Sequence, residues 1–141
     1  MKVDHQTRAY IAGVLDCDGS IYIARTSARI YQLRVAVYNS KEQLVGWFKD
    51  KLGGNCNNIK RTGAKRSREF CWFVSSLAAA EVISLALPYL VVKRKQALLA
   101  LEFASTIGGI SGGQQLPKPI VDLRAKIYKQ ICELNKRATV E

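Results

Sequence analysis

The chain has 141 residues, of which 48% are hydrophobic and 23% are charged, and its formal net charge is +11. This length is typical of one domain with its own core, so we expect a single domain over residues 1–141. The sequence has neither an apolar run of the ~20 residues that cross a membrane nor the apolar core of a signal peptide, which excludes the membrane and secreted classes. We therefore expect an intracellular protein without a membrane partner.

The positive charge is concentrated in one part of the chain. Between Arg25 and Arg68 the sequence has eleven basic residues and two acids. Such an asymmetry favours a polyanionic partner, and nucleic acid is the simplest one. A solvated basic surface without a partner is the alternative interpretation.

The first predicted element is a helix over residues 5–15, with Asp4 as its N-cap and Gly19 as the residue that ends it. Ala9, Gly13 and Cys17 recur every four residues, so they share one helical face. Because all three side chains are small, this face allows a second helix, from the same chain or another, to approach closely.

Two acids, Asp16 and Asp18, follow at the C-terminal end of this helix. The negative end of a helix dipole makes carboxylates unfavourable there unless a cation offsets them. The pair therefore indicates a metal site beside the helix seam.

Two strands are predicted next, over residues 20–26 and 30–39, and the second alternates clearly between apolar and polar residues. They predict an antiparallel hairpin with one apolar face and one polar, basic face. Such a ribbon fits a DNA major groove, although a sheet face exposed to solvent would also alternate in this way.

The rest of the chain predicts a helix over 41–52, a second hairpin with strands over 56–61 and 68–75, and a helix over 77–87. Two further helices are expected, one that ends near residue 106 and one over 120–135. The tip of the second hairpin is basic without any acid, so we expect it to contact phosphates. Which face of strand 68–75 meets the partner is open, because both of its faces are apolar.

Residue types for zinc or nucleophilic chemistry are scarce. The four cysteines show no C-x-x-C spacing and His5 is the only histidine, which argues against zinc sites and catalytic triads. The glycine-rich run over 108–113 lacks the G-K-[ST] ending of a phosphate-binding loop. We therefore expect no small-molecule cofactor.

The run over residues 11–19, IAGVLDCDG, resembles the LAGLIDADG motif of homing endonucleases and is identical to it at Ala12, Gly13, Asp16, Asp18 and Gly19. The predicted element order, α-β-β-α-β-β-α, is also that of the family, so the resemblance covers most of the chain. It implies an α+β homing-endonuclease fold with an antiparallel, saddle-shaped sheet and, here, additional C-terminal helices. The sequence holds one motif, which implies a homodimer in which two motif helices pack at Ala9, Ala12, Gly13, Asp16 and Cys17.

The resemblance also implies an activity: site-specific cleavage of both strands of double-stranded DNA, across the minor groove of a long pseudo-palindromic site. Asp18 and the Gly19 carbonyl match the positions that bind a divalent metal, Mg²⁺ or Mn²⁺, while Asp16 is usually structural in the family. Lys93 matches a lysine expected to act electrostatically near the scissile phosphate, unless it is an ordinary basic residue. Lys41 stands where the family often carries glutamine near the attacking water, which is a departure.

Base and phosphate contacts are expected from both hairpins. In the first hairpin Arg34 suits guanine and Gln32 suits adenine. The full set of residues expected to contact DNA is Tyr22, Ala24, Thr26, Arg29, Gln32, Arg34, Ala36, Tyr38, Asn58, Lys60, Arg61, Lys65, Arg66 and Arg68.

Two other functions remain open from the sequence. One is a non-cleaving relative on the same fold, either an intron-splicing RNA maturase or a DNA-binding protein. The other is a basic structural protein associated with RNA or the ribosome, which would explain the charge but not the motif.

Overall fold

The computed structural model describes residues 2–28, 30–60, 68–108 and 115–136. Its elements follow the order predicted from the sequence: α1 (His5–Asp18), β1 (Gly19–Ser27), β2 (Ile30–Asn39), α2 (Glu42–Leu52), β3 (Asn55–Lys60), β4 (Arg68–Ser75), α3 (Ser76–Ala86), the short 3₁₀ helix η1 (Leu87–Tyr89), α4 (Arg94–Ala104) and α5 (Lys118–Asn135). None of the helices in the described ranges has the length and apolarity needed to cross a membrane.

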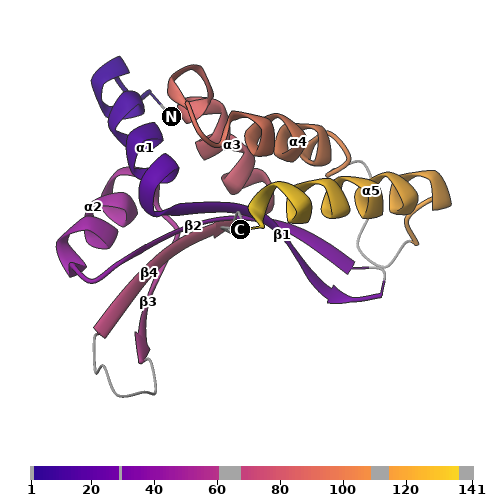
Figure 1. Ribbon diagram of the computed structural model, residues 1–141, viewed down its shortest axis with the longest axis horizontal. Helices are drawn as coiled ribbons and strands as arrows, with labels where there is room; N and C mark the ends of the chain where they lie inside the picture. The colour runs from indigo at the N-terminus through magenta and orange to yellow at the C-terminus, as the bar shows by residue number, and fades with distance from the viewer. Residues whose placement is uncertain (1, 29, 61–67, 109–114, 137–141) are drawn as a thin grey trace, which may run out of the picture.

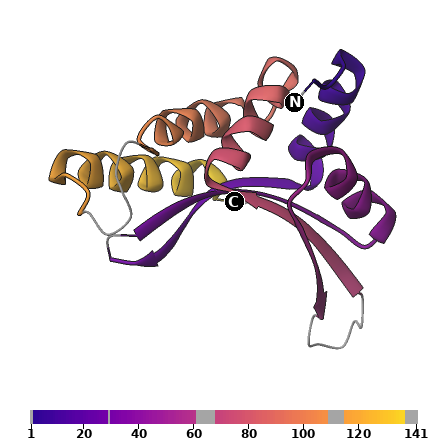
Figure 2. The same ribbon diagram turned by 180° about the vertical axis from the view of Figure 1, so that it is seen from behind.

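The four strands form one antiparallel sheet in the order β1-β2-β4-β3. All five α-helices lie over one face of this sheet, and the two hairpins curve away from them, so that the opposite face is concave and uncovered (Figure 1). The reverse view shows the same arched outline (Figure 2). The predicted saddle is therefore confirmed, and we call its uncovered side the saddle face.

The predicted alternation of β2 explains how the sheet divides its two faces. Leu33, Val35 and Val37 are fully buried under the helices, where α1 contributes Ile11 and Leu15 to the same core. Burying each such side chain stabilises the fold by about 1.5–3 kcal/mol. The β2 side chains of the opposite parity, Gln32, Arg34, Ala36 and Tyr38, point toward the saddle face.

β4 lies in the middle of the sheet, and Trp72 settles which of its faces is inside. The Trp72 ring is fully buried, 4.9 Å from that of Phe48 of α2, and its Nε1 donates to the Gly53 carbonyl at 2.7 Å. Phe70 and Val74 pack toward the same core. Residues of the opposite parity, Cys71 and Phe73, therefore belong to the saddle face.

The first helix is longer than predicted, since it continues past Leu15 to Asp18. Asp4 caps its start as expected, with its carboxylate accepting from the Thr7 N–H at 2.7 Å. The prediction stopped early because acids at a C-terminal end are unfavourable in an isolated helix. Contacts from elsewhere in the fold remove this penalty.

Candidate metal centre and nucleic-acid interface

Asp16 is bound by the backbone that leads into α4. Its carboxylate accepts from the N–H groups of Val91, Val92 and Lys93 at 2.9, 3.1 and 3.0 Å. The unfavourable position of an acid at the negative end of α1 is thus offset by three N–H donors of the loop that precedes α4. The carboxylate of Asp16 is therefore engaged within its own chain, and the expected position of this residue at a dimer interface stays a prediction.

Lys93 also bonds the end of α1 through its side chain. Its Nζ donates to the Asp16 carbonyl at 2.8 Å, so the ammonium lies at the C-terminal end of α1 and offsets the helix dipole. The lysine that the resemblance singled out is therefore adjacent to the motif. The structure brings together two residues that are 77 positions apart in the sequence.

Asp18, the last residue of α1, has a different environment from Asp16. Its side chain is exposed, and its Oδ2 accepts from Nδ2 of Asn39 at 3.0 Å. Asn39 in turn accepts, through Oδ1, from the backbone N–H of Lys41 at 2.8 Å. Two sets of hydrogen bonds therefore meet at the end of α1: Asp18 is linked to the Lys41 backbone through Asn39, and Asp16 is bonded by Lys93.

The residues present fit a divalent cation only in part. Among the described residues, no group of three His, Cys, Asp or Glu side chains could hold a metal ion. One chain supplies the exposed Asp18 carboxylate, whose Oδ1 makes no hydrogen bond within the described ranges. Mg²⁺ is commonly held by one or two carboxylates with waters and substrate phosphates, so this donor fits the ion when the other ligands come from outside the chain.

Gly19 has a steric reason to be glycine. A Cβ at this position would lie 2.6 Å from the Leu15 Cα and 2.7 Å from the Leu15 carbonyl oxygen, which are backbone atoms that cannot move aside. Gly19 also donates its N–H to that carbonyl, where the chain leaves α1 and enters β1. The last residue of the motif is therefore required by the close approach of helix and strand, whether or not its carbonyl binds metal.

Replacing Gly19 with alanine is expected to lower the free energy of unfolding by about 3 kcal/mol, the upper part of the overpacking range. The matched control is Gly46→Ala in α2, where an added Cβ meets nothing within 4 Å. It should stabilise the protein by up to about 1 kcal/mol, because alanine favours helix. Urea unfolding of the two variants measures this; equal effects would contradict the steric explanation.

The first hairpin presents most of its predicted DNA-contacting residues on the saddle face. Tyr22, Ala24, Gln32, Arg34 and Tyr38 are partly exposed there, and Nε of Arg34 donates to Oε1 of Gln32 at 3.0 Å. The two predicted base-reading side chains are therefore held as one unit. Thr26 is exposed near the end of β1.

Two predicted contacts do not have the expected position. Ala36 has the predicted parity but is fully buried, because its methyl group lies between larger saddle-face neighbours such as Phe73, its partner in β4. Asn58 pairs with Phe70, whose side chain packs toward the core, so Asn58 belongs to the helix-covered face. Its neighbour Asn57 pairs with Cys71, so Asn57 rather than Asn58 lies on the saddle face.

The basic tip of the second hairpin falls on residues 61–67. Arg61, Lys65 and Arg66 of this tip lie outside the described residues, as does Arg29 in the turn of the first hairpin. The backbones of Lys60 and Arg68 pair with each other at the end of the described ladder. The expected phosphate contacts of this tip stay predictions.

Tyr38 forms a small cluster on the saddle face with Tyr22 and Cys71. Burial, reinforced by these two neighbours, raises the pKa of the Tyr38 hydroxyl to about 12. Because the pKa in the folded state lies above that of a free tyrosine, the neutral hydroxyl contributes stability that is fully present below pH 10 and is lost as the pH rises to 12.

Between pH 9 and 12, the free energy of unfolding of the parent is therefore expected to fall more steeply than that of Tyr38→Phe. Urea unfolding at intervals of half a pH unit measures the difference. Tyr10→Phe, at a half-exposed tyrosine outside the cluster, is the control and should follow the parent. If the free energy of unfolding falls equally with pH in the parent and in Tyr38→Phe, the cluster does not favour the neutral form of the Tyr38 hydroxyl.

The small-residue face of α1 is open. Ala9, Gly13 and Cys17 are all exposed, as a seam for a second helix requires. Ala12 was expected at the same interface, but it is fully buried inside the chain and has no surface to offer. The small side chain at this position of the motif is explained by the packing of α1 against the core of its own chain.

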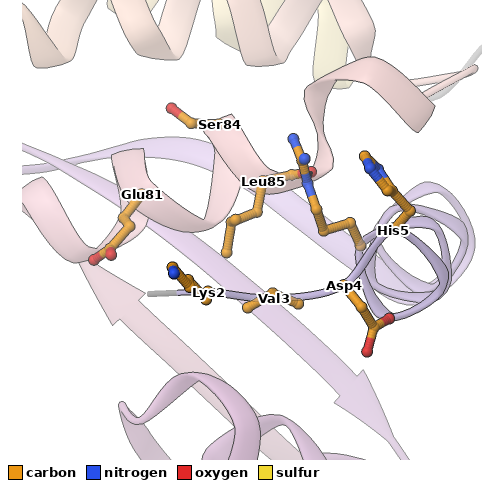
Figure 3. Close-up of a pocket in the computed structure, with 8 residues that line it drawn as sticks. Lys2, Val3, Asp4, His5, Glu81, Ser84 and Leu85 are labelled. Atoms are coloured by element: carbon orange, nitrogen blue, oxygen red, sulfur yellow. Dashed lines mark hydrogen bonds between the residues drawn. The ribbon is translucent and has the colours of Figure 1, made fainter.

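A cavity of about 760 Å³ lies at the opposite end of α1, between the N-terminal segment and α3 (Figure 3). Its lining includes His5 and Arg8, which bond Tyr89 and the Leu85 carbonyl respectively. A 14-residue helix is about 20 Å long, so this cavity is remote from Asp18. It does not belong to the site at the end of the motif.

Comparison with known proteins identifies the architecture. No family model and no curated protein matches the sequence. Among solved structures, the homing endonuclease I-CvuI, in complex with its target in the presence of calcium, matches with a TM-score of 0.68, 23% identity and coverage of 96% of this chain and 87% of the other. The archaeal intron-encoded homing endonuclease I-Vdi141I, complexed with DNA, matches with a TM-score of 0.73, 14% identity and coverage of 95% and 87%.

A second kind of match is to longer chains. The LAGLIDADG homing endonuclease I-GzeII, in complex with its DNA target, matches with a TM-score of 0.59 and 16% identity over 90% of this chain but only 43% of its own. The overall arrangement of the helices and the sheet is thus shared with these structures. The chain has the fold of the LAGLIDADG homing endonucleases.

Proposed function

We propose that this protein is a homodimeric, site-specific DNA endonuclease that uses a divalent metal. The observation that carries the proposal is the position of Asp18: an exposed carboxylate with one unbonded oxygen, at the end of an open helix face and beside Lys93. A protein that only binds nucleic acid has no need of such an acid. DNA complexes among the structural neighbours support the same class of partner.

Dimerisation is supported by exposed apolar side chains near the small-residue face of α1. The loop held by Asp16 presents Val91 and Val92, which are 84% and 69% exposed. Their backbone is bonded to Asp16, the neighbour of Cys17 in α1, and a second copy that packs on Ala9, Gly13 and Cys17 would also cover these two valines. The neighbours of about twice this length, of which this chain covers 43%, fit a site assembled from two such units.

In the dimer, Asp18 and the Gly19 carbonyl of each copy would hold the metal, either Mg²⁺ or Mn²⁺. A bound Mg²⁺ supplies a water of lowered pKa and stabilises charge on the leaving oxygen. Lys93 keeps a fixed positive charge at the end of α1, where it attracts the scissile phosphate. Lys41, whose backbone is tied to Asp18 through Asn39, lies where a side chain can contact the attacking water.

The saddle face would bind the DNA on either side of this centre. Tyr22, Gln32 and Arg34 would read bases of a long, nearly palindromic site in its major groove, and the basic tips would contact phosphates. The two metal sites near the dimer axis would then cut both strands across the minor groove.

The activity is tested by incubating the protein with a random library of DNA duplexes and Mg²⁺, and sequencing the cut ends. Cutting at one long, partly symmetric site, abolished by EDTA, is expected. Retention of a specific site without cutting would favour a non-cleaving DNA-binding protein. Preference for structured RNA over every duplex would favour a maturase.

The dimer is tested separately, by analytical ultracentrifugation. Gly13→Arg places bulk and like charge on the small-residue face of α1 and is expected to yield monomers that no longer cut DNA, although an added Cβ at Gly13 meets nothing within 4 Å of its own chain. Ser84→Arg, on the exposed face of α3, is the control and should stay dimeric. A parent that is monomeric at micromolar concentration, with and without DNA, would overturn this part of the proposal.

A further inference from the structure

Asn39 is a residue that neither the motif nor the element order singles out. It is the last residue of β2, and Gly19, the first residue of β1, pairs with Val37 two positions earlier. Continued by one residue, this antiparallel register would place Tyr38 opposite Asp18, so Asn39 at the end of β2 extends one residue further along the end of α1. This register, set by the hairpin, is what brings the Asn39 side chain to Asp18.

The two hydrogen bonds of Asn39 fix how its amide is turned. Oδ1 accepts from the backbone N–H of Lys41 at 2.8 Å, an arrangement known as an Asx-turn. Since an N–H can only bond the oxygen, the NH₂ group must face the other way, toward Oδ2 of Asp18 at 3.0 Å. The orientation of the amide follows from these partners rather than from the similar shape of its two ends.

This arrangement constrains Asp18 without neutralising it. The donated hydrogen bond occupies Oδ2 and leaves Oδ1 without a partner among the described residues. An amide carries no net charge, so the carboxylate keeps its full attraction for a cation. A lysine or arginine in place of Asn39 would hold the side chain equally well but would compete with the metal.

We propose that Asn39 is a positioning residue for the metal site: it holds the Asp18 carboxylate with one oxygen free to bind a divalent cation, and through the same amide it sets the distance between that carboxylate and Lys41. The assignment rests on the proposed function, in that Asp18 binds the metal. Groups that orient a metal ligand typically change metal affinity by 10- to 100-fold when they are removed.

The test uses two substitutions that separate the two hydrogen bonds. Asn39→Ala removes both, whereas Asn39→Ser keeps an oxygen near the Lys41 N–H but is too short to reach Asp18. Asn135→Ala is the matched control, because the Asn135 amide also bridges two groups, donating to the Ile21 carbonyl and accepting from Gln96, but it does not bond Asp18. Mn²⁺ affinity is measured by electron paramagnetic resonance on the dimer bound to its DNA site, and thermal unfolding is measured in parallel.

Both Asn39 variants are expected to weaken Mn²⁺ binding by at least tenfold and to raise the Mg²⁺ concentration for half-maximal cleavage by a similar factor, with DNA affinity in EDTA unchanged. Asn135→Ala should lower the melting temperature and leave Mn²⁺ affinity as in the parent. If Asn39→Ala lowers only the melting temperature, Asn39 is a turn residue and the assignment is wrong, while the proposed function stands. A parent that binds no Mn²⁺ on DNA would overturn both.

Discussion

Replacing Asp18 with asparagine is expected to reduce DNA cleavage by more than about a hundredfold while DNA binding stays within a fewfold of the parent. The loss of a ligand should exceed the 10- to 100-fold that the loss of a supporting group costs. The fold should survive, because the asparagine carbonyl can still accept from Nδ2 of Asn39, as Oδ2 of Asp18 does at 3.0 Å. The position left for the metal then carries an NH₂ group, which cannot coordinate a cation.

Single-turnover cleavage and a gel-shift assay on the selected DNA site measure the two quantities. Asp50→Asn is the matched control, since it makes the same change of charge at an exposed residue of α2. Cleavage by Asp50→Asn should equal that of the parent. Full cleavage by Asp18→Asn would show that the metal, if one is used, binds elsewhere.

Replacing Asp16 with alanine is expected to act mainly on stability, lowering the free energy of unfolding by about 2–3 kcal/mol. Three backbone N–H groups lose a charged acceptor, and such bonds are worth roughly 1.5–3 kcal/mol each when buried, less here because water can reach two of them. The melting temperature should fall by roughly 10 °C. Because the loop also carries Lys93, cleavage should fall with it.

Asp16→Asn removes the negative charge of this side chain but keeps an oxygen that can accept hydrogen bonds, so it separates the two contributions to stability. Its amide oxygen can still accept from part of the loop, so its stability should lie between those of the parent and Asp16→Ala. Asp50→Ala, at an exposed acid that forms no hydrogen bond with the described residues, is the control and should change the free energy of unfolding by less than about 0.5 kcal/mol. A loss in Asp16→Ala no greater than in this control would mean that the junction of α1 and α4 does not depend on the carboxylate.

The secondary structure was predicted well because it depends on local periodicity. The alternation of Leu33, Val35 and Val37 indicated which face of the hairpin is buried, and the structure confirms it. The same reasoning failed for strand 68–75, since Phe70, Cys71, Trp72 and Phe73 are apolar on both faces. Only the position of β4 in the middle of the sheet, under α2, decides that Trp72 points inward.

The candidate site was predicted in part. The motif marked Asp16 and Asp18, the wider family resemblance marked Lys93, and all three lie at the end of α1. Their roles differ, however, by contacts that are distant in the sequence: Asp16 is bonded to residues 75 to 77 positions away. Asn39 was missed because no pattern marks it, although pairing the two strands in register would have brought it near Asp18.

By itself, the sequence determined the order of the helices and strands, the buried face of the first hairpin, the concentration of positive charge and the small residues along α1. These properties follow from which residues are neighbours along the chain. The tertiary structure alone decided that Ala12 and Ala36 are buried, that Asn57 rather than Asn58 belongs to the saddle face, and that the two acids of the motif have separate partners. Those outcomes depend on strand register and on the contact of α1 with the loop that precedes α4, which are set by packing between distant segments.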